Sequence, residues 1–151
     1  MKLIFGASHM PGSLLLQFFT FSRWSHVGIV YGGFVIEARF PRVRMTTVAD
    51  FQAHYPRWEF AKLPCADEGA AEAYARSRIG RLYDLGGLLA FPFQNRAWES
   101  SSRDFCSELP ILAAAAGGTR YVREHALSRV TPGMLYDLSL DPDPVRDKPR
   151  R

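Results

Sequence analysis

The chain has 151 residues, of which 47% are hydrophobic and 13% aromatic, so it is long and apolar enough for one small domain with its own core. Its net charge of +4 comes without an aromatic-interleaved basic stripe or a nucleic-acid-binding motif, so we expect no nucleic acid partner. Cys65 and Cys106 are too few for a disulfide framework, and with the four histidines they show no metal-ligand spacing. The composition therefore predicts a domain that needs no disulfide, metal ion or other cofactor.

The N-terminal segment predicts a strand over residues 3–5 and a core helix over about 12–21, with Pro11 at its start. No export signal is evident, because glycines interrupt what would be its apolar core. The apolar run at 14–21 is far too short to span a bilayer. We therefore expect a cytoplasmic protein without stable membrane insertion, which would reach a cell-wall substrate only after lysis or when carried by a particle.

A β-hairpin is predicted next, because two apolar segments, 26–31 and 34–39, flank Gly32-Gly33. Two glycines suit a two-residue hairpin loop because both tolerate φ > 0. This loop sets the register, with Tyr31 facing Phe34, and side chains then alternate between two faces. One face is apolar and carries Val27, Ile29, Tyr31, Phe34, Ile36 and Ala38, and the other carries His26, Gly28, Val30, Val35, Glu37 and Arg39.

His26 and Glu37 become diagonal cross-strand neighbours in this register, within reach of one another. A carboxylate that touches an imidazole fixes its tautomer and stabilises the imidazolium. Gly28 has no side chain and is expected to leave open space beside the pair. The alternative is a partly exposed strand pair with no functional role.

The remaining chain predicts alternating strands and helices, so we expect an α+β domain with a mostly antiparallel sheet of four to six strands packed against helices. We assign residues 1–140 to this domain. Residues 141–151, with three prolines and alternating charges, are predicted to form a disordered tail. The predicted elements are strands at 42–46 and 58–63, helices at 48–54 and 67–79, a further helix at 84–91 and a loop at 92–102.

Cys106 falls in or near the first turn of a predicted buried helix, since residues 109–116 are rich in helix formers and end at Gly117-Gly118. Residues 100–104 supply serines and an aspartate of the capping type. Helix N-terminal N–H groups favour a thiolate and can hold an oxyanion. The alternative is that Cys106 is a small buried hydrophobic residue, and Cys65 is interpreted as incidental.

The ordered set of motifs resembles the circularly permuted NlpC/P60 (papain-like) hydrolases. It comprises Lys-Leu-Ile-Phe at 2–5, Ser-His-Val-Gly-Ile-Val at 25–30, Val-Ile-Glu-Ala at 35–38, Tyr-Asp at 83–84, Phe-Cys-Ser-Glu-Leu at 105–109 and Thr-Pro-Gly at 131–133. The resemblance implies a papain-like fold in permuted order and a catalytic triad of Cys106, His26 and Glu37, with Tyr83 lining the substrate site. Lecithin:retinol acyltransferase-like relatives carry a histidine as third member, so Glu37 favours the hydrolase side.

These observations predict a cysteine hydrolase of the amidase or peptidase (thiol protease) type that cleaves an amide bond through a thioester. Peptides, wall peptides and lipids are the candidate substrates, and the oligomeric state is left open. Two alternatives stay open: a lipid-directed acyltransferase or esterase with the same triad, and a non-catalytic binding or structural protein that retains the fold. Arg39, Arg42 and Arg44 fit either a solvated face or attraction to anionic lipid or wall polymer.

Overall fold

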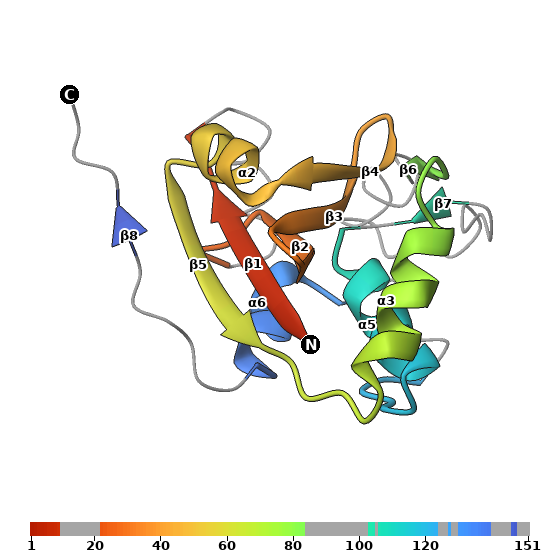
Figure 1. The fold of residues 1–151 in the computed structure, drawn as a ribbon. Helices are drawn as coiled ribbons and strands as arrows, with labels where there is room; N and C mark the ends of the chain where they lie inside the picture. The colour runs from red at the N-terminus through yellow and green to blue at the C-terminus, as the bar shows by residue number, and fades with distance from the viewer. Residues whose placement is uncertain are drawn as a thin grey trace, which may run out of the picture.

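An antiparallel sheet of five long strands forms the centre of the molecule (Figure 1). The structure is a computed structural model, and it describes residues 1–9, 22–83, 103–104, 106–123, 127, 130–139 and 146–147. Each long strand has six residues, close to the length that is typical of globular proteins. The long strands are β1 (Lys2–Ala7), β2 (His26–Tyr31), β3 (Phe34–Arg39), β4 (Arg42–Thr47) and β5 (Arg57–Lys62).

Three two-residue strands extend this sheet at its edges, giving the order β7-β6-β4-β3-β2-β1-β5-β8. These are β6 (Leu82–Tyr83), β7 (Arg103–Asp104) and β8 (Arg146–Asp147). All neighbours pair antiparallel except β6 and β7, which are parallel. The predicted α+β class and mostly antiparallel sheet are therefore confirmed, with short edge strands added to the long ones. Within the predicted tail, β8 pairs with β5.

The β2–β3 hairpin has the predicted register, with Ile29 opposite Ile36 and Tyr31 opposite Phe34. Gly32 and Gly33 have φ values of 53° and 84°, in the left-handed region that the two-residue turn requires. The turn chemistry alone therefore fixed which side chains share a face.

The two faces of the sheet carry separate apolar clusters, and different helices cover them. The larger cluster joins one face to α3 (Glu68–Ser77), α5 (Glu108–Ala116) and α6 (Pro132–Asp137). The smaller cluster joins the other face to α2 (Val48–His54) and consists of Ile4, Val35, Phe51 and Tyr55. The predicted apolar face of the hairpin belongs to the larger cluster, except Phe34, which is 43% exposed at the hairpin end.

Helices α2 and α3 follow their predicted limits closely, whereas α6 was not predicted. α2 matches the prediction, and α3 begins after the N-cap Asp67, whose carboxylate accepts from the Ala70 amide at 2.9 Å. α6 begins after Thr131, which accepts from the Met134 amide. The predicted helices at 12–21 and 84–91 and the loop at 92–102 lie outside the described residues. Among the described residues, no helix is both long and apolar enough to cross a bilayer.

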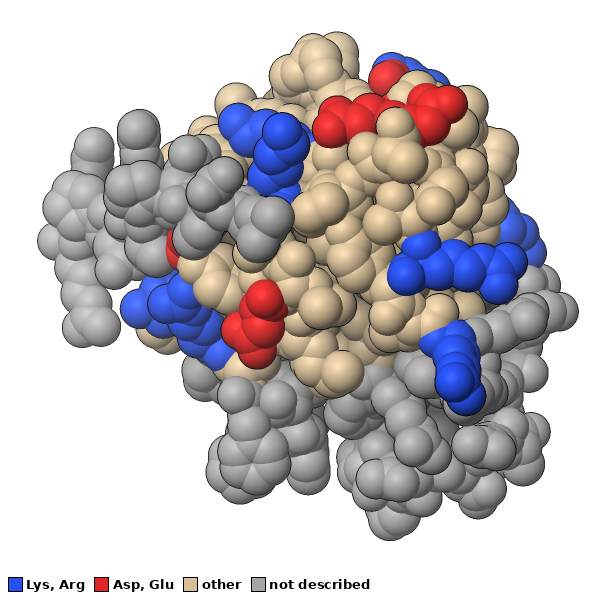
Figure 2. All heavy atoms as spheres, turned by 90° about the horizontal axis from the view of Figure 1, so that it is seen from below, with Lys and Arg blue, Asp and Glu red and all other residues tan. Residues whose placement is uncertain are grey.

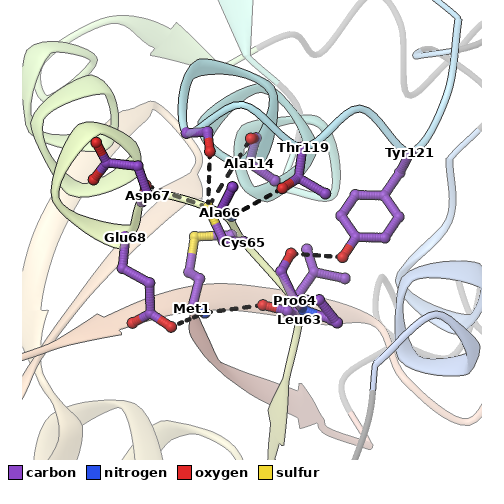
Figure 3. A network of polar contacts seen from close by, with 11 residues as sticks. Met1, Leu63, Pro64, Cys65, Ala66, Asp67, Glu68, Ala114, Thr119 and Tyr121 are labelled. Atoms are coloured by element: carbon purple, nitrogen blue, oxygen red, sulfur yellow. Dashed lines mark hydrogen bonds and ion pairs between the residues drawn. The ribbon is translucent and has the colours of Figure 1, made fainter.

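Cys65 packs where the connection from β5 to α3 meets the end of α5 (Figure 3). Its thiol donates to the Asp67 carbonyl at 3.4 Å and lies 3.8 Å from the Gly117 carbonyl. A Cβ at Gly117 would come within 2.5 Å of the Cys65 sulfur, so the end of α5 and the connection from β5 to α3 approach each other closely. Nearby, the Met1 nitrogen donates to the Leu63 carbonyl at 2.9 Å, which ties the start of β1 to the end of β5.

Candidate active site

His26 and Glu37 form a buried pair between β2 and β3. Nε2 of His26 lies 2.7 Å from Oε2 of Glu37, and the two residues are 6% and 1% exposed. His26 begins β2 opposite Gly6 of β1, and the Ser25 amide donates to the Gly6 carbonyl at 3.1 Å. The predicted neighbour relationship is therefore present, and the prediction of a partly exposed strand pair does not fit this burial.

Arg44 holds the second oxygen of Glu37 from the neighbouring strand. Its Nε and Nη2 lie 2.9 Å and 2.8 Å from Oε1 of Glu37. The contact follows from the β3–β4 ladder, in which Glu37 stands opposite Arg44. Arg44 is half-exposed, so a surface arginine anchors a buried carboxylate. The sequence analysis did not include Arg44 in the site, although a tight β3–β4 turn would have placed it there.

Cys106 is buried directly before the first residues of α5. Its side chain lies close enough to the imidazole of His26 to raise the pKa of that ring. Because Nε2 of His26 faces Glu37, we expect Nδ1 to be the ring nitrogen that serves the thiol. The structure therefore brings together the three residues that the sequence analysis proposed as a triad.

The start of α5 differs from the prediction that residues 100–104 cap it. The N-cap is Ser107, and Arg103–Asp104 instead form β7. Ser107 makes no side-chain capping bond, because its hydroxyl donates to the Val130 carbonyl at 2.5 Å. The helix thus begins beside Cys106 without a side-chain oxygen over its first amides. Ser100 to Ser102 lie outside the described residues.

The contacts of His26 and Glu37 set their protonation. Burial alone lowers the pKa of His26, but the hydrogen bonds with Cys106 and Glu37 and their charges raise it to about 9. Burial alone raises the pKa of Glu37, but His26 and Arg44 outweigh it and lower that pKa to about 2. At neutral pH the pair is therefore an imidazolium and a carboxylate.

Two aromatic rings of the α2 region pack against His26. The imidazole stacks on Tyr55 at a centroid distance of 5.3 Å and an interplanar angle of 16°, and on Phe51 at 5.9 Å and 26°. Gly6 lies under the Tyr55 ring, and a Cβ there would come within 2.6 Å of it. Burial raises the pKa of the Tyr55 phenol, so it stays neutral. The sequence analysis missed both rings, although their (i, i+4) spacing places them on one helix face.

Two further expectations concern Gly28 and Tyr83. The expected open space at Gly28 is filled: a Cβ there would come within 2.3 Å of Cγ1 of Val35. Gly28 is therefore required for close packing of the hairpin, and the prediction of open space was wrong. The Tyr83 backbone is in β6, and the position of its side chain lies outside what the structure describes.

The fold is similar to that of a known structure, the crystal structure of the metalloprotein YiiX from Escherichia coli O157:H7, a DUF1105 protein. The two share 23% sequence identity with a TM-score of 0.62 over 79% of this chain. The matched region spans 66% of the YiiX chain, slightly less than two thirds. No family model and no curated protein matches the chain. At this identity the likeness shows a shared α+β fold alone.

The term metalloprotein applies to YiiX, so we asked whether the site described here suits a metal ion. Among the described residues, no group of three or more His, Cys, Asp and Glu side chains could hold one. In the pair of His26 and Glu37, Nε2 and Oε2 bind each other, and Arg44 places a positive charge on the remaining oxygen. These donors do not fit a metal site.

Proposed function

We propose that the protein is a cysteine hydrolase of the circularly permuted NlpC/P60 type, with Cys106 as nucleophile, His26 as base and Glu37 as the residue that orients the base. One observation carries the proposal: a buried imidazole bonds a carboxylate at 2.7 Å through Nε2 and lies close enough to a buried thiol for that thiol to raise its pKa. A nucleophile, a base and an orienting group in contact define such a triad by geometry and not by chain order.

His26 already holds the proton of Cys106, so the reaction begins from a thiolate and an imidazolium. The thiolate attacks the carbonyl carbon of an amide, and the tetrahedral intermediate collapses as His26 returns the proton to the leaving amine. A thioester remains on Cys106. Water, deprotonated by His26, then attacks the thioester and releases the acid and the thiol.

The amide groups at the start of α5 are suited to hold the oxyanion. Helix N-termini present N–H groups without intrahelical partners, together with the positive end of the helix dipole. Ser107 leaves these groups without a side-chain cap. One well-aimed donor of this kind contributes about 3 kcal/mol in comparable hydrolases.

Active-site labelling and a substrate panel test the proposal. We expect iodoacetamide to inactivate the enzyme by modifying Cys106, and Cys106→Ala to abolish turnover with the fold intact. Cys65→Ala is the matched control, because that thiol bonds backbone carbonyls away from His26. Hydrolysis of wall peptides or other amides supports the amidase, whereas transfer of acyl groups from lipid esters would identify the acyltransferase. Unchanged turnover of any substrate by Cys106→Ala would refute the triad.

A further inference from the structure

Arg44 contacts the candidate site from outside the triad, and no step of the proposed reaction uses it. Its Nε and Nη2 donate to Oε1 of Glu37 at 2.9 Å and 2.8 Å, while Oε2 of Glu37 bonds His26 at 2.7 Å. Each oxygen of the carboxylate therefore faces a different cation at neutral pH. Glu37 connects the arginine to the base, so a change at Arg44 can act on His26 without direct contact.

The charges of the site balance only when Arg44 is included. In the proposed reaction the thiolate of Cys106 and the carboxylate of Glu37 are two anions, and the imidazolium of His26 is one cation. A carboxylate that faced the imidazolium alone would oppose a second anion at Cys106, because like charges disfavour each other in a buried site. The guanidinium of Arg44 supplies the fourth charge, and the sum of the four is zero.

Burial makes this partner necessary for Glu37. Its side chain is 1% exposed, whereas that of Arg44 is 44% exposed. A buried carboxylate without enough partners takes up a proton, and one partner seldom repays the loss of water around both oxygens. Arg44 therefore helps to keep Glu37 charged, and with His26 it lowers the pKa of that carboxyl.

The bonds of Arg44 also fix which oxygen of Glu37 faces His26. Both N–H groups belong to one rigid, planar guanidinium, and Arg44 stands opposite Glu37 in the β3–β4 ladder. The carboxylate cannot turn and exchange its oxygens unless both bonds break. A lysine would supply the charge through one compact ammonium and without this fork, so a substitution can separate charge from orientation.

A matched comparison for the charge lies on the same strand. Arg42 stands two residues before Arg44 on the same face of β4, opposite Arg39. Among the described side chains, Glu37 bonds Arg44 and His26 and does not bond Arg42. On the face seen in Figure 2, acidic side chains lie among the basic ones, so that face has no field of one sign. Loss of Arg42 therefore tests charge in general, whereas loss of Arg44 tests the contact.

We propose that Arg44 is a positioning residue: it holds Glu37 charged and turned toward His26, and so allows the thiolate to form at Cys106. The inference rests on the proposed function, because it concerns the same thiol. An ion pair with a purely structural role would behave differently, since its loss would lower the stability of the fold and leave the pH dependence of Cys106 unchanged.

Iodoacetamide labelling of Cys106 between about pH 4 and pH 8, followed by mass spectrometry, tests this role in the full chain. In Arg44→Met the pH of half-maximal labelling should rise by about 1, the effect of losing one nearby positive charge. Arg44→Lys should restore part of the shift, because it returns the charge without the fork. Arg42→Gln should move the profile much less, since water and salt screen an exposed charge that does not touch the site.

Titration of the Glu37 carboxyl carbon, measured by NMR, is a second readout that does not need a reactive thiol. In Arg44→Met the pKa of Glu37 should rise from about 2 toward 4.5, whereas Arg42→Gln should leave it near 2. Labelling of Cys65 in the same samples reports whether each variant stays folded. If Arg44→Met unfolds, Arg44→Gln takes its place with the same expectations.

Two kinds of failure can be told apart. A fast reaction of wild-type Cys106 with an unchanged profile in Arg44→Met, or an equal shift in Arg42→Gln, would overturn this inference alone. So would Arg44→Lys with no recovery or with complete recovery of the profile. A wild-type Cys106 that reacts no faster than Cys65 would overturn the proposed function, and this inference with it.

Discussion

Glu37→Gln is the substitution that examines the site most directly, because it exchanges one atom and reverses a hydrogen bond. Arg44 donates twice to Oε1 of Glu37, so the glutamine carbonyl oxygen is held at that position. The amide nitrogen then takes the place of Oε2, 2.7 Å from Nε2 of His26, and donates to it. His26 must accept there and carry its proton on Nδ1, which is the nitrogen left for Cys106. In this tautomer the base is already protonated where it must accept.

The expected size of the effect comes from the pKa of His26. Its rise from 6.5 to about 9 corresponds to about 3 kcal/mol, at about 1.4 kcal/mol per unit. Cys106 and Glu37 both raise this pKa, so loss of the carboxylate removes only part of the rise, and we expect the pKa of His26 in Glu37→Gln to lie below its value of about 9 in the wild type. Turnover should fall by about two to four orders of magnitude. The upper limit is the loss of about 10⁴ in kcat that a serine protease shows when its orienting carboxylate is removed.

The same shifts predict where stability is lost. A raised pKa of His26 stabilises the fold fully below pH 6.5, and this contribution disappears as pH rises through about 9. A lowered pKa of Glu37 stabilises it fully above pH 4.5, and this contribution disappears as pH falls through about 2. The two contributions share one interaction and are not added. The deficit of Glu37→Gln should therefore be largest between pH 4.5 and 6.5.

Two measurements check these expectations: NMR titration of the His26 ring nitrogens, and urea denaturation across the pH range. Glu59→Gln is the matched control. Glu59 is about as buried as Glu37, and its Oε1 accepts from the Tyr136 hydroxyl at 2.5 Å, in a part of the molecule that does not include His26. It should lower stability but leave the titration of His26 and the turnover unchanged. An unshifted His26 pKa in Glu37→Gln, in a protein that remains folded, would refute the assignment of the carboxylate as the group that stabilises the imidazolium.

Two other predictions concern the thiols and the aromatic packing. Cys106 should react with iodoacetamide faster than Cys65 at pH 6 to 7, because the imidazolium of His26 favours a thiolate, and His26→Ala should slow the reaction of Cys106 alone. Mass spectrometry measures both rates, and equal rates at the two thiols would contradict this prediction. Gly6→Ala should destabilise the fold by about 1–3 kcal/mol in urea denaturation, since its Cβ would meet the Tyr55 ring at 2.6 Å, and an unchanged midpoint would show that the ring moves freely.

The hairpin and its histidine–carboxylate pair could be predicted because their causes are local. Gly32-Gly33 fixes the turn, the turn fixes the register, and period-two alternation then puts His26 and Glu37 on one face. The limits of α2 followed for the same kind of reason, since Thr47 caps it by accepting from the Asp50 amide at 3.0 Å.

The missing parts of the site depend on contacts between elements that are distant in sequence. The serines and aspartate before Cys106 suggested a cap, but Arg103–Asp104 pair with β6 in parallel, and no local pattern indicates such a pairing. The Tyr55 ring reaches His26 only because β1 places a glycine beneath it. The helix predicted over 48–54 gave no indication that Phe51 would pack against His26.

The β3–β4 ladder supplies the positive charge that holds the buried carboxylate. Glu37 stands opposite Arg44, and two residues further along β3 Arg39 stands opposite Arg42 on the same face. Arg44 bonds Glu37, whereas Arg39 bonds the ring of His54. A one-residue slip of β4 against β3 would turn Arg44 to the other face and remove the bond that holds Glu37. The register of this ladder is therefore as necessary to the site as the register of the hairpin.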